Sequence, residues 1–87
     1  MNKYESIIIV NPSVDEAGLK ALEEKFTGLI NENGKVESVE NIGKKRLAYE
    51  IKKFKEGTYM LFNFEANPDS IKELERVYRI TDDIIKF

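Results

Sequence analysis

The hydrophobic pattern begins with a strand and continues with a helix. Residues 5–10, ESIIIV, are mostly β-branched and apolar on both faces, which predicts a central strand. Ser13 and Glu16 have the spacing of a capping box, so we expect a helix to begin beside them. Asn33-Gly34 is expected to end this helix in a left-handed conformation. The apolar stripe of the helix comprises Leu19, Leu22, Phe26, Leu29 and Ile30.

Two strands and a turn are predicted next. Val36 and Val39 cannot lie on one face of a regular strand because their spacing is odd, so we expect a bulge or strong twist nearby, with Gly43 as a contributor. Beyond the bulge, apolar Leu47, Tyr49 and Ile51 alternate with mostly polar neighbours. A turn is predicted over residues 53–57 and a return strand over 58–66. On the return strand one face is apolar, and we expect it to meet the helices: Met60, Phe62, Phe64 and Ala66.

A second helix and a short last strand complete the pattern. Asn67-Pro68 starts the helix, with Ser70 and Glu73 as another possible capping box, and residues 84–87 form the strand. The apolar stripe of this helix comprises Ile71, Leu74, Val77 and Tyr78. The element order predicts one α+β domain over residues 1–87, a ferredoxin-like βαββαβ sandwich with a four-stranded antiparallel sheet and both helices on one face.

In this fold the first and third strands are central and the second lies at an edge. The sheet face without helices is then apolar enough to need a partner. Its apolar residues are Ile7, Ile9, Tyr59 and Leu61.

The composition argues against an enzyme. The chain has no cysteine and no histidine, so the commonest nucleophile, general base and metal ligand are missing, and we expect no cofactor and no metal. Acylphosphatases share this fold and size, but their first loop needs an anion cradle with an arginine, which Asn11-Pro12-Ser13 does not supply. No apolar run approaches the ~20 residues of a membrane span, and we expect a cytoplasmic protein.

Positive charge is concentrated in one segment. Residues 43–55 carry six basic side chains and one acid, a local charge of +5, whereas the chain has a formal net charge of −2. Clustered Lys and Arg on a hairpin predict contacts with nucleic-acid phosphates. The alternative is that lysines on an edge strand only prevent aggregation. Glu56 and Thr58 do not fit the basic and aromatic positions of the RNA-recognition-motif signature, so we expect contacts with backbone and shape rather than a base code.

Several short motifs resemble one family. They are Lys3-Tyr4-Glu5, Asn11-Pro12, the run GKKRLAYEIKK over residues 43–53, Gly57-Thr58-Tyr59 and the run YRITDDIIK over residues 78–86. Together they resemble the bacterial small-subunit ribosomal protein six family over essentially the whole chain. The run RLAYxI over residues 46–51 is the most specific part.

The resemblance implies a non-enzymatic constituent of the cytoplasmic small ribosomal subunit. It implies binding to small-subunit ribosomal RNA (rRNA) in the central domain, in the platform, as a heterodimer with small-subunit ribosomal protein eighteen. The rRNA contacts implied by position are Lys3, Lys53, Lys55 and Lys86; the partner-protein contacts are Lys45, Arg46, Leu47, Ala48 and Tyr49. The alternative is a regulatory module that homodimerises through its open sheet face and binds a small effector.

Overall fold

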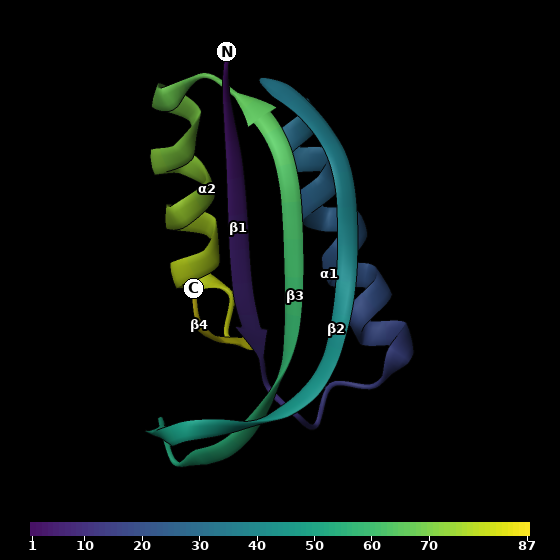
Figure 1. Cartoon of the computed structure of the whole chain (residues 1–87), viewed down its shortest axis with the longest axis vertical. Helices are drawn as coiled ribbons and strands as arrows, with labels where there is room; N and C mark the ends of the chain where they lie inside the picture. The colour runs from purple at the N-terminus through teal and green to yellow at the C-terminus, as the bar shows by residue number, and fades with distance from the viewer.

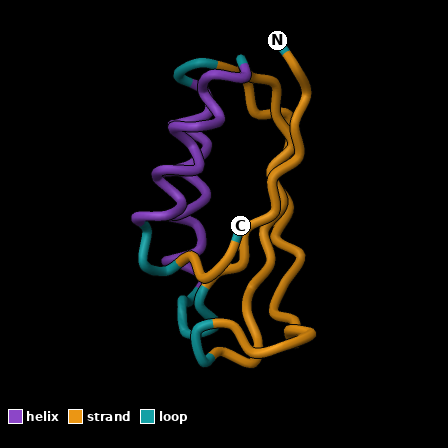
Figure 2. Tube along the Cα trace, turned by 90° about the vertical axis from the view of Figure 1, so that its left-hand side faces the viewer, coloured by secondary structure: helices purple, strands orange, loops and turns teal.

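A sheet of four strands is covered on one face by two helices in the computed structural model, which describes residues 1–87 (Figures 1 and 2). The strand order is β2-β3-β1-β4, and the paired strands are antiparallel. This confirms the predicted ferredoxin-like fold, with β1 and β3 central and β2 at an edge. Neither helix is long and apolar enough to cross a membrane. The elements are β1 (Asn2–Val10), α1 (Glu16–Asn31), β2 (Gly34–Ile51), β3 (Phe54–Ala66), α2 (Pro68–Ile80) and β4 (Ile84–Lys86).

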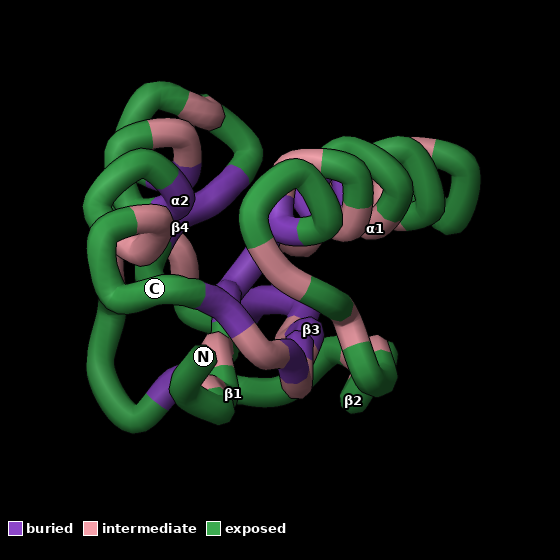
Figure 3. Tube along the Cα trace, turned by 90° about the horizontal axis from the view of Figure 1, so that it is seen from above, coloured by how far each residue is buried: buried purple, intermediate pink, exposed green.

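The main core lies between the sheet and the helices, where buried stretches of the two layers face each other (Figure 3). Phe26 of α1 is at its centre, with ring centroids 4.8 Å from Tyr78 of α2 and 6.4 Å from Phe62 of β3. Both contacts are edge-to-face, a favourable arrangement for aromatic rings. Phe62 and Phe64 face the helices as predicted, and both helical stripes point inward.

Both predicted capping boxes are wrong. The cap of α1 is Asp15, whose carboxylate accepts from the Gly18 amide at 2.8 Å. Ser13 lies two residues before this cap, in a tight turn at Asn11 in which the Ser13 amide donates to the Asn11 side chain. At α2, the Ser70 hydroxyl donates to the carbonyl of Asn67 at 2.7 Å instead of accepting.

The predicted left-handed end of α1 is also wrong, because neither Asn33 nor Gly34 has a positive φ. Glycine at position 34 serves a different purpose. A Cβ there would lie 2.1 Å from the carbonyl oxygen of Glu65, so only glycine lets β2 begin this close to β3.

The predicted bulge in β2 is confirmed. The β2–β3 register shifts between Val36 and Ser38, which allows both Val36 and Val39 to pack against the main core. A second shift lies between Asn41 and Gly43, where Gly43 has a φ of 103°.

The predicted turn over residues 53–57 is wrong. The strands continue to a two-residue turn at Lys52 and Lys53, with φ values of 50° and 71°, and Ile51 pairs with Phe54. Two left-handed residues give the turn the twist that a tight hairpin requires. Lysine rarely adopts this conformation, so the sequence carries no Asn-Gly signal of the turn.

A third register shift lies near the hairpin tip. Arg46 pairs with Glu56 and Ile51 with Phe54, so residues 47–50 of β2 face only Lys55 of β3. The predicted alternation therefore breaks: Leu47 is buried and Ile51 half-buried, but Tyr49 is exposed.

The hairpin covers part of the sheet face that has no helices. It crosses the end of β1 beside β4 (Figure 1), and Leu47 packs there with Ile9 and Ile85 in a second, smaller core. Ile9 is therefore buried, contrary to the expectation of an open apolar face. Ile7, two residues earlier in β1, is exposed.

Candidate nucleic-acid interface

Three basic side chains of the hairpin surround one shallow hollow on the surface. Arg46 comes from β2, Lys53 from the turn and Lys55 from β3. All three are exposed, and they share the hollow with a single acid, Glu56. Arg46 of β2 pairs with Glu56 of β3, so these two opposite charges lie across from each other on the hairpin. Exposed Lys and Arg side chains around a hollow can contact a phosphate group.

Two further residues line this hollow that the sequence did not single out as site residues. Pro12 reaches it from the loop between β1 and α1, and Phe54 from the start of β3. The sequence analysis used Asn11-Pro12 as part of the first loop and as a family motif, and did not assign it to the site. Its position beside the hairpin follows from the way the hairpin crosses β1.

Lys86 of β4 meets Tyr49 of the hairpin. The Lys86 ammonium donates to the Tyr49 hydroxyl at 3.0 Å, although the two residues are 37 positions apart in the chain. This hydrogen bond lowers the pKa of Tyr49 below its ordinary value of 10.0, and the positive charge of Lys86 acts in the same direction. The same hydrogen bond raises the pKa of Lys86 above 10.5. Lys86 is therefore a cation at neutral pH that lies beside an exposed aromatic ring.

Lys3 lies apart from the other predicted rRNA contacts. It is near the start of β1, at the end of the sheet opposite the hairpin tip (Figure 1). Its ammonium is 4.0 Å from the carboxylate of Glu37, and both side chains are in contact with solvent, so this ion pair adds little to stability.

The predicted partner-protein residues lie along the edge strand β2. The side chains of Lys45, Arg46, Ala48 and Tyr49 are exposed there. Leu47 is different, because its side chain is 9% exposed and packs inward on Ile9. The roles of these residues in binding stay predictions.

A model of the family described as ribosomal protein S6 matches residues 3–87. The chain belongs to the ribosomal protein S6 family. It is 56% identical to small ribosomal subunit protein bS6 of Clostridium perfringens over 87 residues, which are 99% of this chain and 92% of that protein. It is 52% identical to bS6 of Clostridium novyi over 88 residues, covering 100% and 93% of the two chains. The crystal structure of 30S ribosomal protein S6 from Thermotoga maritima superposes with a TM-score of 0.90 at 41% identity, covering 97% of this chain and 80% of that one.

Membership of the S6 family confirms three predictions. The suspected family is right, the protein is a component of the small ribosomal subunit, and the family consists of structural proteins rather than enzymes. The solved S6 structure supports the ferredoxin-like fold independently of the strand order.

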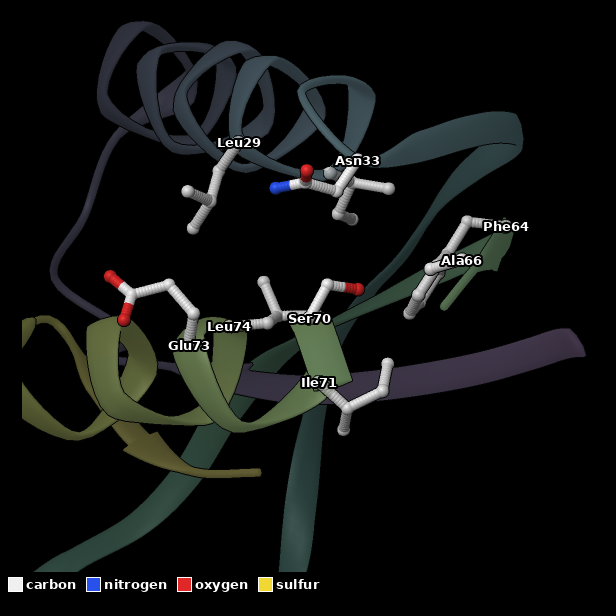
Figure 4. A pocket seen from close by; sticks show the side chains of 9 residues that line it. Leu29, Asn33, Phe64, Ala66, Ser70, Ile71, Glu73 and Leu74 are labelled. Carbon is white, nitrogen blue, oxygen red and sulfur yellow. The ribbon is translucent and has the colours of Figure 1, made fainter. Parts of the chain in front are cut away.

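The most enclosed pocket of the protein lies between the two helices, away from the basic hairpin (Figure 4). Its volume is about 20 Å³, enough for a single water molecule. Leu29 and Asn33 of the α1 side face Ser70 and Glu73 of α2 across it. Glu73 is held by Arg76 at 2.6 Å, and this hydrogen bond lowers the pKa of Glu73, so the carboxylate stays ionised at neutral pH. This pocket is too small for a metabolite.

Proposed function

We propose that the protein binds the central domain of small-subunit rRNA, in the platform, as a heterodimer with small-subunit ribosomal protein eighteen. The observation that carries the proposal is the gathering of Arg46, Lys53 and Lys55 around one hollow on a chain that is otherwise acidic. No observation favours the alternative of a regulatory module that binds an effector.

The charge distribution supports an oriented contact. The part of the chain outside residues 43–55 has a formal charge of −7, which repels a polyanion. At physiological salt the Debye length is about 8 Å, so a phosphate near the hairpin responds mainly to the hairpin's own cations. RNA therefore approaches with the hairpin toward it.

The predicted contacts fall into two regions of the surface. Lys53, Lys55 and Lys86 belong to the half of the molecule that holds the hairpin, and Lys3 belongs to the opposite end (Figure 1). The molecule is 36 Å long on its longest axis. In this proposal the hairpin half binds one stretch of rRNA backbone, and Lys3 touches a second.

The partner protein is assigned to the outer side of β2. This strand pairs only with β3, so one row of its backbone groups has no partner within the chain. The exposed side chains of Lys45, Arg46 and Ala48 follow this edge. A second protein along β2 would thus lie next to the basic hollow, and both proteins could contact the same RNA.

The test is a titration of a central-domain rRNA fragment, with and without ribosomal protein eighteen, at several potassium chloride concentrations. We expect tight binding only with the partner present. Lys53→Ala and Lys86→Ala should each lower the slope of log K against log[salt] by roughly one, because each removes one phosphate contact.

The matched control is Lys72→Ala, an exposed lysine on α2, which should leave the slope unchanged. Absence of binding both with and without the partner would refute the proposal. Equal effects of Lys72→Ala and Lys53→Ala would show that only net charge matters, and would refute the assignment of the site to the hairpin.

A further inference from the structure

Tyr49 is the most exposed aromatic side chain of the protein. Its relative exposure is 63%, compared with 45% for Phe87 and 2% for Tyr78. The register shift between Arg46 and Ile51 explains this position, because it turns Tyr49 outward while its neighbours in the alternation, Leu47 and Ile51, pack inward. Tyr49 adds nothing to either core.

The exposed ring nevertheless has one contact with another strand. The ammonium of Lys86 is 3.0 Å from the hydroxyl oxygen of Tyr49 and 5.3 Å from the ring centre. It therefore lies off the hydroxyl end of the ring rather than against its face. Since tyrosine has only two side-chain torsions, ordering its ring against a base costs little conformational entropy.

The charge around Tyr49 fits a polyanion. Within the hairpin, residues 43–55 carry a net +5, and Lys86 adds a further cation from β4. RNA-binding proteins commonly stack unpaired bases on exposed aromatic rings and neutralise the adjoining phosphate with a nearby cation. Lysine has three N–H donors, so Lys86 can keep its bond to Tyr49 and still contact a phosphate oxygen.

We propose that Tyr49 and Lys86 form a binding site for one unpaired nucleotide of the rRNA. The base stacks on the Tyr49 ring, and the Lys86 ammonium contacts the phosphate of the same or the adjoining nucleotide. This assigns Tyr49 to RNA rather than to the partner protein, and it rests on the proposed binding to rRNA. Stacking alone does not distinguish bases, so the site selects an unpaired nucleotide and not a sequence.

The test uses the full chain with ribosomal protein eighteen and the central-domain rRNA fragment. Tyr49→Leu should weaken binding by about 10- to 100-fold, the usual effect of removing a stacking side chain, without changing the salt slope. Tyr49→Phe should retain most of the affinity because the ring remains. Lys86→Met should lower the salt slope by about one, because a phosphate contact is lost.

Chemical probing of the RNA bases provides a second measurement. One unpaired base should be protected in the wild-type complex and in Tyr49→Phe, and become reactive in Tyr49→Leu at saturating protein. The urea unfolding midpoint of Tyr49→Leu should match that of the wild type, since the side chain is outside both cores.

The outcomes separate this inference from the proposed function. If the wild type does not bind the fragment at all, the proposed function fails. If the wild type binds and Tyr49→Leu binds equally well, only the nucleotide site is refuted. If Tyr49→Leu weakens the association with ribosomal protein eighteen in the absence of RNA, Tyr49 is a protein contact and the inference is overturned.

Discussion

Gly57 of β3 lies directly against Ile9 of β1, and a Cβ added to Gly57 would come within 2.4 Å of Ile9 Cγ2. The same Cβ would be 3.2 Å from the carbonyl oxygen of Val10 and 3.4 Å from a methyl group of Ile85. The missing side chain thus allows the hairpin to cross the end of β1 in close contact. This contact positions Leu47 over Ile9 and Tyr49 beside Lys86.

Gly57→Ala should therefore destabilise the protein. Overpacking a site of this kind typically costs about 1–3 kcal/mol in the free energy of unfolding. The loss can be measured by urea denaturation. Gly28→Ala is the matched control, since its Cβ would meet nothing within 4 Å and the position lies inside α1. That variant should gain about 0.5–1 kcal/mol. A Gly57→Ala protein as stable as the wild type would mean that the crossing is looser than the structure indicates.

Replacing Lys53 with glycine should make the protein more stable and weaken its binding to rRNA. With a φ of 71°, Lys53 carries about 1–2 kcal/mol of backbone strain, which glycine relieves at some cost in chain entropy. Lys53→Gly should thus raise the free energy of unfolding by about 0.5–1 kcal/mol, measured by urea denaturation. It should also lose affinity for rRNA, because the cation is gone.

Lys53→Ala separates the two effects, because it removes the charge and leaves the strain. It should lose the same affinity without gaining stability. If both variants are equally stable, the turn is not strained at this residue.

Tyr78 should make the protein sensitive to alkali. Its ring is buried and its hydroxyl is 3.1 Å from the hydroxyl of Ser6, and burial raises its pKa above the ordinary 10.0. Above pH 10 the unfolded chain releases this proton while the folded protein retains it, so stability falls as pH rises from 10 toward the raised pKa. Below pH 10 Tyr78 contributes no pH dependence.

Tyr78→Phe tests this linkage by urea unfolding at neutral pH and above pH 10. It should cost about 1 kcal/mol at neutral pH through the lost hydrogen bond, and show a smaller loss of stability in alkali than the wild type. Ser6→Ala breaks the same hydrogen bond but keeps the phenol, so its alkaline loss should persist. If the free energy of unfolding falls equally with pH in Tyr78→Phe and in the wild type, the alkaline loss of stability does not come from Tyr78.

Side-chain periodicity predicted the elements well where one face of an element meets the main core. Phe62 and Phe64 were placed correctly because β3 is regular over that stretch and its other face carries Asn63 and Glu65. The helix caps were predicted less well, since Ser13 and Asp15 both have suitable side chains. In the structure Ser13 lies in the turn at Asn11, and Asp15 is the residue whose carboxylate accepts from the first turn of the helix.

The candidate site was predicted in part. The basic character of residues 43–55 was plain from the sequence, and the roles of individual lysines came from the family resemblance. That Arg46, Lys53 and Lys55 share a hollow with Pro12 depends on the register of the hairpin and on its crossing of β1. Neither is encoded in a local pattern.

The sequence by itself determined the element order, the inward faces of both helices and of β3, the separation of charge and the family. These follow from neighbouring residues, because apolar periodicity reports which side of an element is buried. Only the tertiary structure decided that Ile9 is covered by Leu47, that the turn falls at Lys52 and Lys53, and that Tyr49 meets Lys86. These features depend on a register shift and on contacts between distant segments. Hydrophobic alternation does not show how many residues of one strand lack a partner on the next strand.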